Sequence, residues 1–243
     1  MSLPRILAHI AEPAEGCLVP LDAEQAAHLR ALRLKAGSAL ELLLGEGPWK
    51  AELAELGRDA AVARLVAPLN EDREPPIEIE IFLPLTAQLN LVDDLIPPLV
   101  ELGAGRIVPV IFARSEFDPR KTQDRMERWR RILKGAVEQS HRSILPHVAD
   151  PAPFETLLAC PAPQKWVAYE VDSGQPNPSL RRENLALTSG PEGGITDGEI
   201  EALRAAGWTP VHLGQAILRA VTAPVALLGA VQFELGRHLP REE

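Results

Sequence analysis

The sequence has few of the features that mark membrane, secreted or metal-binding proteins. Its only two cysteines, Cys17 and Cys160, lie far apart, with no CxxC pair and no neighbouring histidine. This spacing favours neither a disulfide framework nor a zinc site, so we expect no metal. No apolar run reaches the length of a membrane span, and the N-terminus lacks an apolar stretch followed by a cleavage site. We therefore expect a soluble, cytoplasmic protein with no membrane contact.

Aromatic residues and positive charge are also scarce. One Tyr, four Trp and five Phe in 243 residues predict a core built mostly from aliphatic side chains. The net charge of -9 argues against a protein that coats nucleic acid non-specifically, because that affinity comes mainly from neutralising phosphates. Any contact with RNA would have to be local. Residues 28–35 and 114–142 carry three and nine cations, but such charge runs are also typical of solvated helix faces.

Two domains are predicted. Residues 17–68 consist of short apolar pieces separated by glycine and proline, which is typical of a small β-rich module. Its one helical candidate covers residues 22–34, with Asp22 as N-cap. The segment 70–76, NEDREPP, is charged and ends in two prolines, as inter-domain linkers often do. We place the boundary there, giving domains of residues 1–70 and 71–243.

The second domain has an α/β pattern. Strand-like runs such as IEIEIFLPL and RIVPVIF alternate with helical segments, which favours a doubly wound, parallel sheet. A long helix is expected from Asp118, as its cap, and Pro119, as its first residue. The apolar residues expected on one face of this helix are Met126, Trp129, Leu133, Ala136 and Val137.

Two glycine-containing loops carry the strongest local pattern. In LTSGPEGGITDGEIEAL, a strand runs into the loop around Gly190 and then into a helix that Thr196 and Glu199 begin with a capping box. Glycines let a ligand approach backbone amides, although a tight turn also uses them and the stretch is no dinucleotide fingerprint. A second such loop follows in VHLGQAILR, around Gly214. Loops at the carboxyl ends of parallel strands converge, so the sequence predicts one shared pocket.

These blocks resemble a known family. SGPEGGIT, HLGQAILRAVTA, AVEQSHRSILP and VELGAGRIVPVIFARSEF are similar in order and spacing to the bacterial RsmE enzymes, which methylate a uridine of 16S ribosomal RNA at N3. The N-terminal HLRALRLKAG also resembles that family's PUA-like RNA-binding domain. The resemblance implies a PUA-like β-barrel in residues 1–70. It also implies a SPOUT methyltransferase domain with a deep trefoil knot in residues 71–243, rather than a doubly wound sheet.

The resemblance also implies the cofactor, the partners and the site. We expect S-adenosyl-L-methionine as methyl donor, 16S ribosomal RNA of the small subunit as substrate, and a homodimer that shares its active sites. Arg219, Glu138 and Arg142 are the expected catalytic residues, with Arg219 stabilising charge on the uracil. The expected cofactor contacts are Tyr169, Ser189, Gly190, Pro191, Glu192, Gly193, Gly194, Leu213, Gly214, Ile217, Leu218 and Thr222.

Other interpretations stay open. Arg219 could hold an RNA phosphate or cap a carbonyl, and Glu138 with Arg142 could be an ordinary i, i+4 surface pair. Val221 stands where the family usually has Glu, and Pro98 where it has Lys, while Pro97 and Pro98 are expected to distort their helix. The alternative is therefore a catalytically impaired relative that binds RNA or S-adenosylmethionine without efficient methyl transfer. A dinucleotide-dependent enzyme would need a fingerprint that the sequence lacks.

Overall fold

The computed structural model describes residues 3–45, 47–71, 73–86, 88–115, 123–170 and 176–237. Contacts divide the chain into two compact units. The first unit holds Met1–Glu74 together with Val137–Ile144, and the second holds Pro75–Ala136 and Leu145–Glu243. Helix α3 therefore contributes its last turn to the first unit and the rest of its length to the second.

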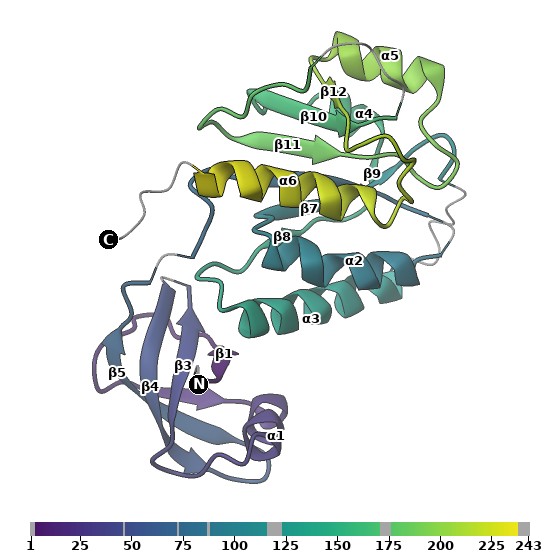
Figure 1. Cartoon of the computed structure of the whole chain (residues 1–243). Coiled ribbons are helices and arrows are strands. Elements are labelled where there is room, and N and C mark those ends of the chain that lie inside the picture. The colour runs from purple at the N-terminus through teal and green to yellow at the C-terminus, as the bar shows by residue number, and fades with distance from the viewer. Residues whose placement is uncertain are drawn as a thin grey trace. The chain divides into compact units, whose positions relative to one another are not determined.

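The first unit is a five-stranded sheet with one helix (Figure 1). Its strands lie in the order β1-β3-β4-β5-β2, and all pairs are antiparallel except the parallel pair β1 and β3. Its elements are β1 (Arg5–Leu7), β2 (Leu18–Leu21), α1 (Ala23–Ala31), β3 (Ala39–Leu44), β4 (Gly47–Leu56) and β5 (Ala61–Pro68).

Helix α1 begins where the sequence predicts it. Asp22 is the N-cap and forms a capping box with Gln25, and the helix ends at Ala31, somewhat before the predicted end. Its buried residues Ala26 and Leu29 pack into a core of leucine, valine and alanine side chains from all five strands. The predicted aliphatic core is confirmed here, since Trp49 is the one aromatic residue of this buried cluster.

The segment 137–144 joins the first unit because polar contacts hold it there. The backbone N–H of Leu7 donates to Glu138 Oε1 at 2.9 Å, and Arg5 donates to the carbonyl oxygens of His141 and Arg142. The predicted boundary at residue 70 differs from this division in two ways: the first unit extends to Glu74, and it includes these residues from the end of α3. Sequence patterns miss the second feature because the contacting residues are about 130 positions apart.

The second unit is built on a seven-stranded parallel sheet. The strands lie in the order β12-β10-β11-β6-β7-β8, with β9 paired to β7. The predicted α/β class is confirmed. The elements are β6 (Ile79–Pro84), α2 (Asn90–Glu101), β7 (Arg106–Ile111), α3 (Gln123–Ser140), β8 (His147–Val148), β9 (Ala152–Pro153), α4 (Glu155–Leu158), β10 (Gln164–Ala168), β11 (Leu185–Thr188), α5 (Asp197–Ala205), β12 (Thr209–Val211) and α6 (Ala223–Arg237).

Helices cover this sheet from two sides. Helix α6 packs on α2 and on strands β10 and β11, whereas α5 packs on α4 and β12. Phe82, Val110 and Ala186 of the sheet belong to the same buried cluster as Leu203 and Trp208, at and just beyond the end of α5. Side chains alternate along a strand, so the residues next to Phe82, Val110 and Ala186 in these strands face the opposite side of the sheet.

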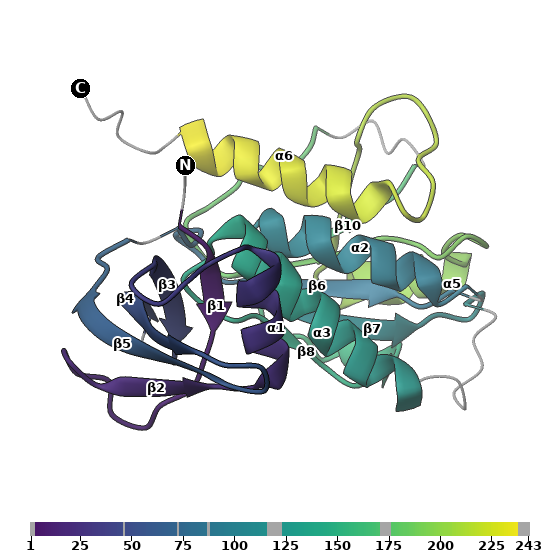
Figure 2. The ribbon, with the colours of Figure 1, turned by 90° about the horizontal axis from the view of Figure 1, so that it is seen from below.

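Helices α2 and α3 lie side by side in both views of the ribbon (Figures 1 and 2). The buried Asp93 of α2 accepts hydrogen bonds from Trp129 Nε1 at 2.9 Å, Arg125 Nη1 at 2.7 Å and Arg128 Nε at 2.6 Å. A buried carboxylate needs such partners, so this contact fixes how the two helices pack. Pro97 and Pro98 lie inside a helix that continues to Glu101, so the expected distortion does not end it.

The predicted apolar face of α3 is confirmed. Its five residues are at most 7% exposed, and Trp129 and Val137 are fully buried. The predicted cap Asp118 and first residue Pro119 lie outside the described residues, whose part of α3 begins at Gln123. Across the described ranges, no helix combines the length and apolarity that crossing a membrane requires.

Candidate functional site

A cavity of about 590 Å³ opens where three neighbouring strands of the parallel sheet end. This volume lies within the usual range of small-molecule sites. The loops that follow β10, β11 and β12 form its walls, and Leu91 of α2 adds one apolar side chain. The order β12-β10-β11 brings these loops together, because parallel strands all end at the same edge of the sheet. The pocket predicted from the two glycine-containing loops is therefore present.

The first wall is the glycine loop, residues 189–195, between β11 and α5. Gly194 has a φ of +75°, and its N–H donates to the carbonyl oxygen of Pro191 at 2.8 Å. The predicted capping box is confirmed: Thr196 is the N-cap of α5, and Glu199 accepts from its backbone. A Cβ atom at Gly190 would lie 3.0 Å from Ile195 Cγ1. The glycines thus allow a tight loop that exposes backbone toward the cavity.

The second wall is the α6 loop, residues 212–222. Gly214 has a φ of +119°, which L side chains rarely adopt, although a Cβ atom there would meet no atom within 4 Å. The carbonyl oxygen of Arg219 accepts hydrogen bonds from the N–H groups of Thr222 and Ala223, at 2.8 and 3.0 Å. The backbone of Arg219 therefore helps to fix the start of α6, while the Arg219 side chain is exposed and lines the cavity.

Asn177 holds the beginning of the α6 loop. Its side-chain oxygen accepts from the His212 N–H, and its amide nitrogen donates to the His212 carbonyl, both at 2.8 Å. This pair of bonds continues the hydrogen bonding of β12 beyond Val211, where the strand ends. Asn177 is an isolated asparagine in a polar stretch, and no sequence pattern identifies it as a functional residue.

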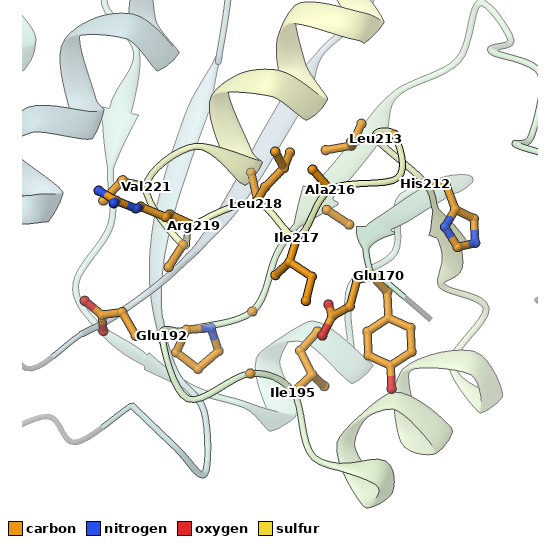
Figure 3. A pocket seen from close by; sticks show the side chains of 18 of the residues that line it. Glu170, Glu192, Ile195, His212, Leu213, Ala216, Ile217, Leu218, Arg219 and Val221 are labelled. Atoms are coloured by element: carbon orange, nitrogen blue, oxygen red, sulfur yellow. The ribbon is translucent and has the colours of Figure 1, made fainter. Parts of the chain in front are cut away.

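Two carboxylates and one guanidinium line the cavity. Glu170 follows β10, Glu192 lies in the glycine loop, and Arg219 lies in the α6 loop. Figure 3 shows Glu192 and Arg219 at one end of the cavity and Glu170 near Ile217 and His212 at the other. Within the described part of the chain, no hydrogen bond or ion pair engages the Arg219 guanidinium. This leaves a cation available to meet an anionic group.

Most of the expected cofactor contacts lie around this cavity. Of the twelve residues, three do not line it: Ser189, Gly193 and Thr222. Ser189 is fully buried beneath the glycine loop, and its hydroxyl has no hydrogen-bond partner among the described residues. The nine that line the cavity are Tyr169, Gly190, Pro191, Glu192, Gly194, Leu213, Gly214, Ile217 and Leu218.

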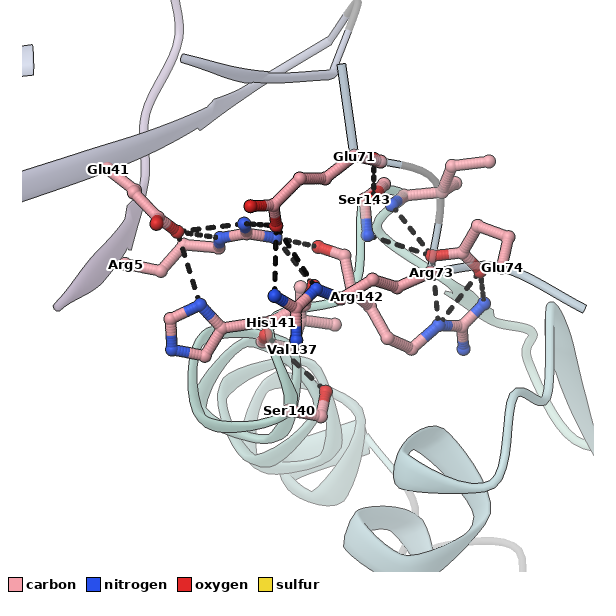
Figure 4. A network of polar contacts seen from close by, with 11 residues as sticks. Arg5, Glu41, Glu71, Arg73, Glu74, Val137, Ser140, His141, Arg142 and Ser143 are labelled. Atoms are coloured by element: carbon pink, nitrogen blue, oxygen red, sulfur yellow. Dashed lines mark hydrogen bonds and ion pairs between the residues drawn. The ribbon is translucent and has the colours of Figure 1, made fainter. Parts of the chain in front are cut away.

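The other two expected catalytic residues belong to the first unit, in a group of polar residues that we call the α3-end cluster (Figure 4). It comprises Arg5, Glu41, Glu71, Arg73, Glu74, Glu138, His141, Arg142 and Ser143. Glu138 accepts from the Leu7 backbone, and the Arg142 guanidinium pairs with Glu74. The cavity is lined by the second unit alone. Their catalytic roles stay predictions.

The centre of the α3-end cluster is Arg5, whose side chain is fully buried. It donates to Glu41 Oε2 at 2.9 Å and to the carbonyl oxygens of His141 and Arg142 at 2.6 and 2.9 Å. His141 has a φ of +56°, a left-handed conformation that ends α3 at Ser140. Arg5 thus binds the two backbone carbonyls that follow the helix.

The one buried thiol is unsuited to nucleophilic chemistry. Burial raises the pKa of Cys160, whose thiol lies 3.9 Å from a carboxylate oxygen of Glu80. Burial also raises the pKa of Glu80, against the opposing effect of Arg106. Neither residue lines the cavity. A thiol with a raised pKa is mostly protonated near neutral pH, so Cys160 is a core residue.

Known proteins share both units. Residues 73–232 match the RNA methyltransferase domain family, and residues 21–66 match the RNA methyltransferase PUA domain family. Ribosomal RNA small subunit methyltransferase E of Synechocystis sp. is 36% identical over 83% of this chain and 68% of its own length. The protein of the same name from Bacillus subtilis is 34% identical over 76% of this chain and 77% of its own length.

Two solved structures are similar over almost the whole chain. Ribosomal RNA small subunit methyltransferase E from Neisseria gonorrhoeae, bound to S-adenosyl methionine, has a TM-score of 0.83 and 29% identity, covering 95% of this chain and 97% of its own. A protein from Legionella pneumophila in complex with the bound cofactor SAM has a TM-score of 0.85 and 26% identity, covering 96% and 98%. The resemblance seen in the sequence is confirmed, and this chain belongs to the ribosomal RNA small subunit methyltransferase E family.

Proposed function

We propose that this protein transfers a methyl group from S-adenosylmethionine to N3 of a uridine in 16S ribosomal RNA of the small subunit. The observation that carries the proposal is the cavity at the ends of β10, β11 and β12, formed by the two loops whose sequences carry the family resemblance. Relatives with the same fold bind S-adenosyl methionine.

The residues of the cavity fit this donor. Apolar side chains of Ile195, Leu213 and Leu218 suit the adenine ring, while backbone groups of the glycine loop suit its polar edge. The carboxylates of Glu170 and Glu192 supply negative charge for a ligand that carries a sulfonium and an ammonium group. The buried Ser189 hydroxyl, which no described residue engages, lies beside Gly190. We therefore assign the donor to this cavity.

Arg219 is the residue that we assign to catalysis. S-adenosylmethionine supplies a methyl group activated by a positively charged sulfur. The nucleophile, N3 of uracil, must lose its proton, so negative charge develops toward the uracil oxygens. Arg219 lines the cavity with its guanidinium free of other described groups, so the guanidinium is available to donate to a uracil oxygen as that charge develops. The turn that caps α6 fixes its backbone.

The remaining assignments follow from the family. We propose that residues 1–70 form a PUA-like RNA-binding domain and residues 71–243 a SPOUT domain with a trefoil knot, acting in the cytoplasm. We further propose a homodimer, with 16S ribosomal RNA as the other partner. Light scattering that shows a monomer at micromolar concentration would refute the homodimer.

Methyl transfer to ribosomal particles tests the function. Small subunits purified from a bacterial strain that lacks the N3-methyluridine of 16S ribosomal RNA should accept a labelled methyl group, and digestion should place the label on N3. Donor affinity measured by calorimetry on the same preparation separates binding from chemistry. Tight donor binding without transfer to any ribosomal RNA would instead identify an impaired relative. Val221, which lines the cavity, and Pro98 would then be replaced by Glu and Lys to restore activity.

A further inference from the structure

The turn that follows β7, residues 112–115, lies against the glycine loop. Arg114 Nη1 donates a hydrogen bond to the carbonyl oxygen of Gly193 at 2.9 Å. The two backbones are so close that a Cβ atom at Gly193 would lie 2.8 Å from Arg114 Cβ and 3.2 Å from its carbonyl oxygen. A real Cβ atom does not tolerate such a distance, so Gly193 is needed for this contact rather than for contact with the cavity.

A second contact joins the same turn to the start of α5. Glu199 Oε1 accepts from the N–H of Ala113 at 2.7 Å, while its Oε2 accepts from the N–H and the hydroxyl of Thr196, both at 2.9 Å. Glu199 is 8% exposed, so one buried carboxylate holds the turn after β7 and the end of the glycine loop together. The partial positive charge at the start of a helix further stabilises this carboxylate.

We propose that Arg114 and Glu199 are positioning residues that hold the glycine loop in the shape that binds the methyl donor. This inference rests on the proposed function. The first contact is made by Gly193 itself, and Gly194 follows it, so the two contacts bracket a segment in which glycine gives the chain great conformational freedom. Ordering such a segment upon binding would weaken donor affinity, and a loop that is held beforehand avoids this loss. Neither residue lines the cavity, so both act through the loop.

Arg114 is exposed, so its guanidinium is also accessible to an RNA phosphate. The two roles differ in what they change. A residue that positions the loop alters donor affinity in the absence of RNA, whereas a phosphate contact alters the KM for RNA and its salt dependence. The structure favours positioning, because the guanidinium already donates to Gly193 and the backbones around it are in close contact.

The experiment uses Arg114→Ala, Arg114→Lys and Glu199→Gln in the full chain, with Arg204→Ala as matched control. Arg204 is an exposed arginine in the last turn of α5, away from the turn after β7. Amide hydrogen exchange on donor-free protein reports on the loop through the N–H of Gly194, which donates to Pro191 within the loop, and on the second contact through the N–H of Thr196, which donates to Glu199. Calorimetry gives the dissociation constant for S-adenosylmethionine, and steady-state kinetics on small subunits give kcat and the KM for RNA.

We expect Arg114→Ala and Glu199→Gln to speed exchange at Gly194 and Thr196 and to weaken donor binding by about tenfold, the effect of one lost charged hydrogen bond. Arg114→Lys should recover part of the affinity, since an ammonium can also donate to one carbonyl. Arg204→Ala should match the wild type. Faster exchange with unchanged donor affinity, or unchanged affinity with a raised KM for RNA, would overturn the inference. If the wild-type protein binds no donor, the proposed function is overturned as well. The exchange rates of the variants still show, independently of donor binding, whether the two contacts hold the loop.

Discussion

The donor cavity and the α3-end cluster are held together in opposite ways. Around the cavity, glycines and backbone hydrogen bonds shape the loops, and the charged side chains Glu170, Glu192 and Arg219 point into open space. In the α3-end cluster, nearly every charged group has a partner of opposite sign, and Arg5 and Arg142 are buried. Unpaired charge is available for binding and chemistry, whereas paired and buried charge contributes to folding.

Replacing Arg142 should have the largest effect on stability. Arg142→Met removes the guanidinium that pairs with the carboxylate of Glu74, to which the N–H groups of Ser143 and Ile144 also donate. Removing one member of a buried ion pair destabilises a protein by about 3 kcal/mol or more. Urea denaturation should show this loss, and calorimetry should show donor affinity within twofold of wild type.

The same variant decides between a structural and a catalytic Arg142. Arg131→Ala is the control, because Arg131 is an exposed arginine of the same helix. Its free energy of unfolding should stay within about 0.5 kcal/mol of wild type. If Arg142→Met kept its stability but lost turnover, the catalytic role implied by the family resemblance would hold, and the contrast between the two regions would fail at this residue.

The second largest effect is expected at Arg219. Arg219→Ala should lower kcat by about a hundredfold, roughly 2.7 kcal/mol, as for other lost groups that stabilise an oxyanion. Donor affinity and stability should change little, since the side chain is exposed and no described residue pairs with it. Arg219→Lys should recover part of the rate, because a point charge lacks the planar guanidinium fork. A loss of donor affinity with unchanged kcat would assign Arg219 to donor binding instead.

The loops themselves should respond to a smaller change. Gly214→Ala places a side chain at a φ of +119°, whereas Gly198→Ala places one in helix α5, and in both positions a Cβ atom meets nothing within 4 Å. Gly198→Ala thus controls for an added methyl group away from the cavity, whereas Gly214→Ala adds backbone strain at a residue that lines it. We expect Gly214→Ala to weaken donor binding by about tenfold, because such a conformation costs a residue with a Cβ about 1–2 kcal/mol. Equal donor affinities in calorimetry would remove Gly214 from the site.

Much of this architecture could be predicted from local patterns. The caps Asp22 and Thr196, the buried face of α3 and the two loops of the cavity each depend on residues within one turn or one heptad of one another. Sequence periodicity and capping rules describe such short distances well. The family resemblance then added the donor and the substrate, which no pattern of spacing contains.

What could not be predicted depends on contacts between distant parts of the chain. Arg5 meets residues 136 and 137 positions away, and Glu199 meets Ala113 across 86 positions. No local rule links such residues, and in the sequence each appears as an ordinary surface charge. Glu138 and Arg142 illustrate the result: their spacing suggested a site or a surface pair, and no spacing could have predicted the partner that each has in the first unit.

The smallest effect is expected at the edge of the α3-end cluster. Arg73 pairs with Glu71 at 3.0 Å, but their side chains are 53% and 41% exposed. Water and salt screen such a pair, so Arg73→Met should reduce the free energy of unfolding by less than about 1 kcal/mol. The loss should shrink further in high salt, whereas the loss in Arg142→Met should persist, because buried charges are screened much less. Urea denaturation of both variants at low and high salt measures this difference directly.

Since Arg73 and Arg142 carry the same group and each pairs with a glutamate of the same short segment, burial is the main variable that separates them. Equal losses at both positions would show that burial does not decide which charges of this cluster stabilise the fold.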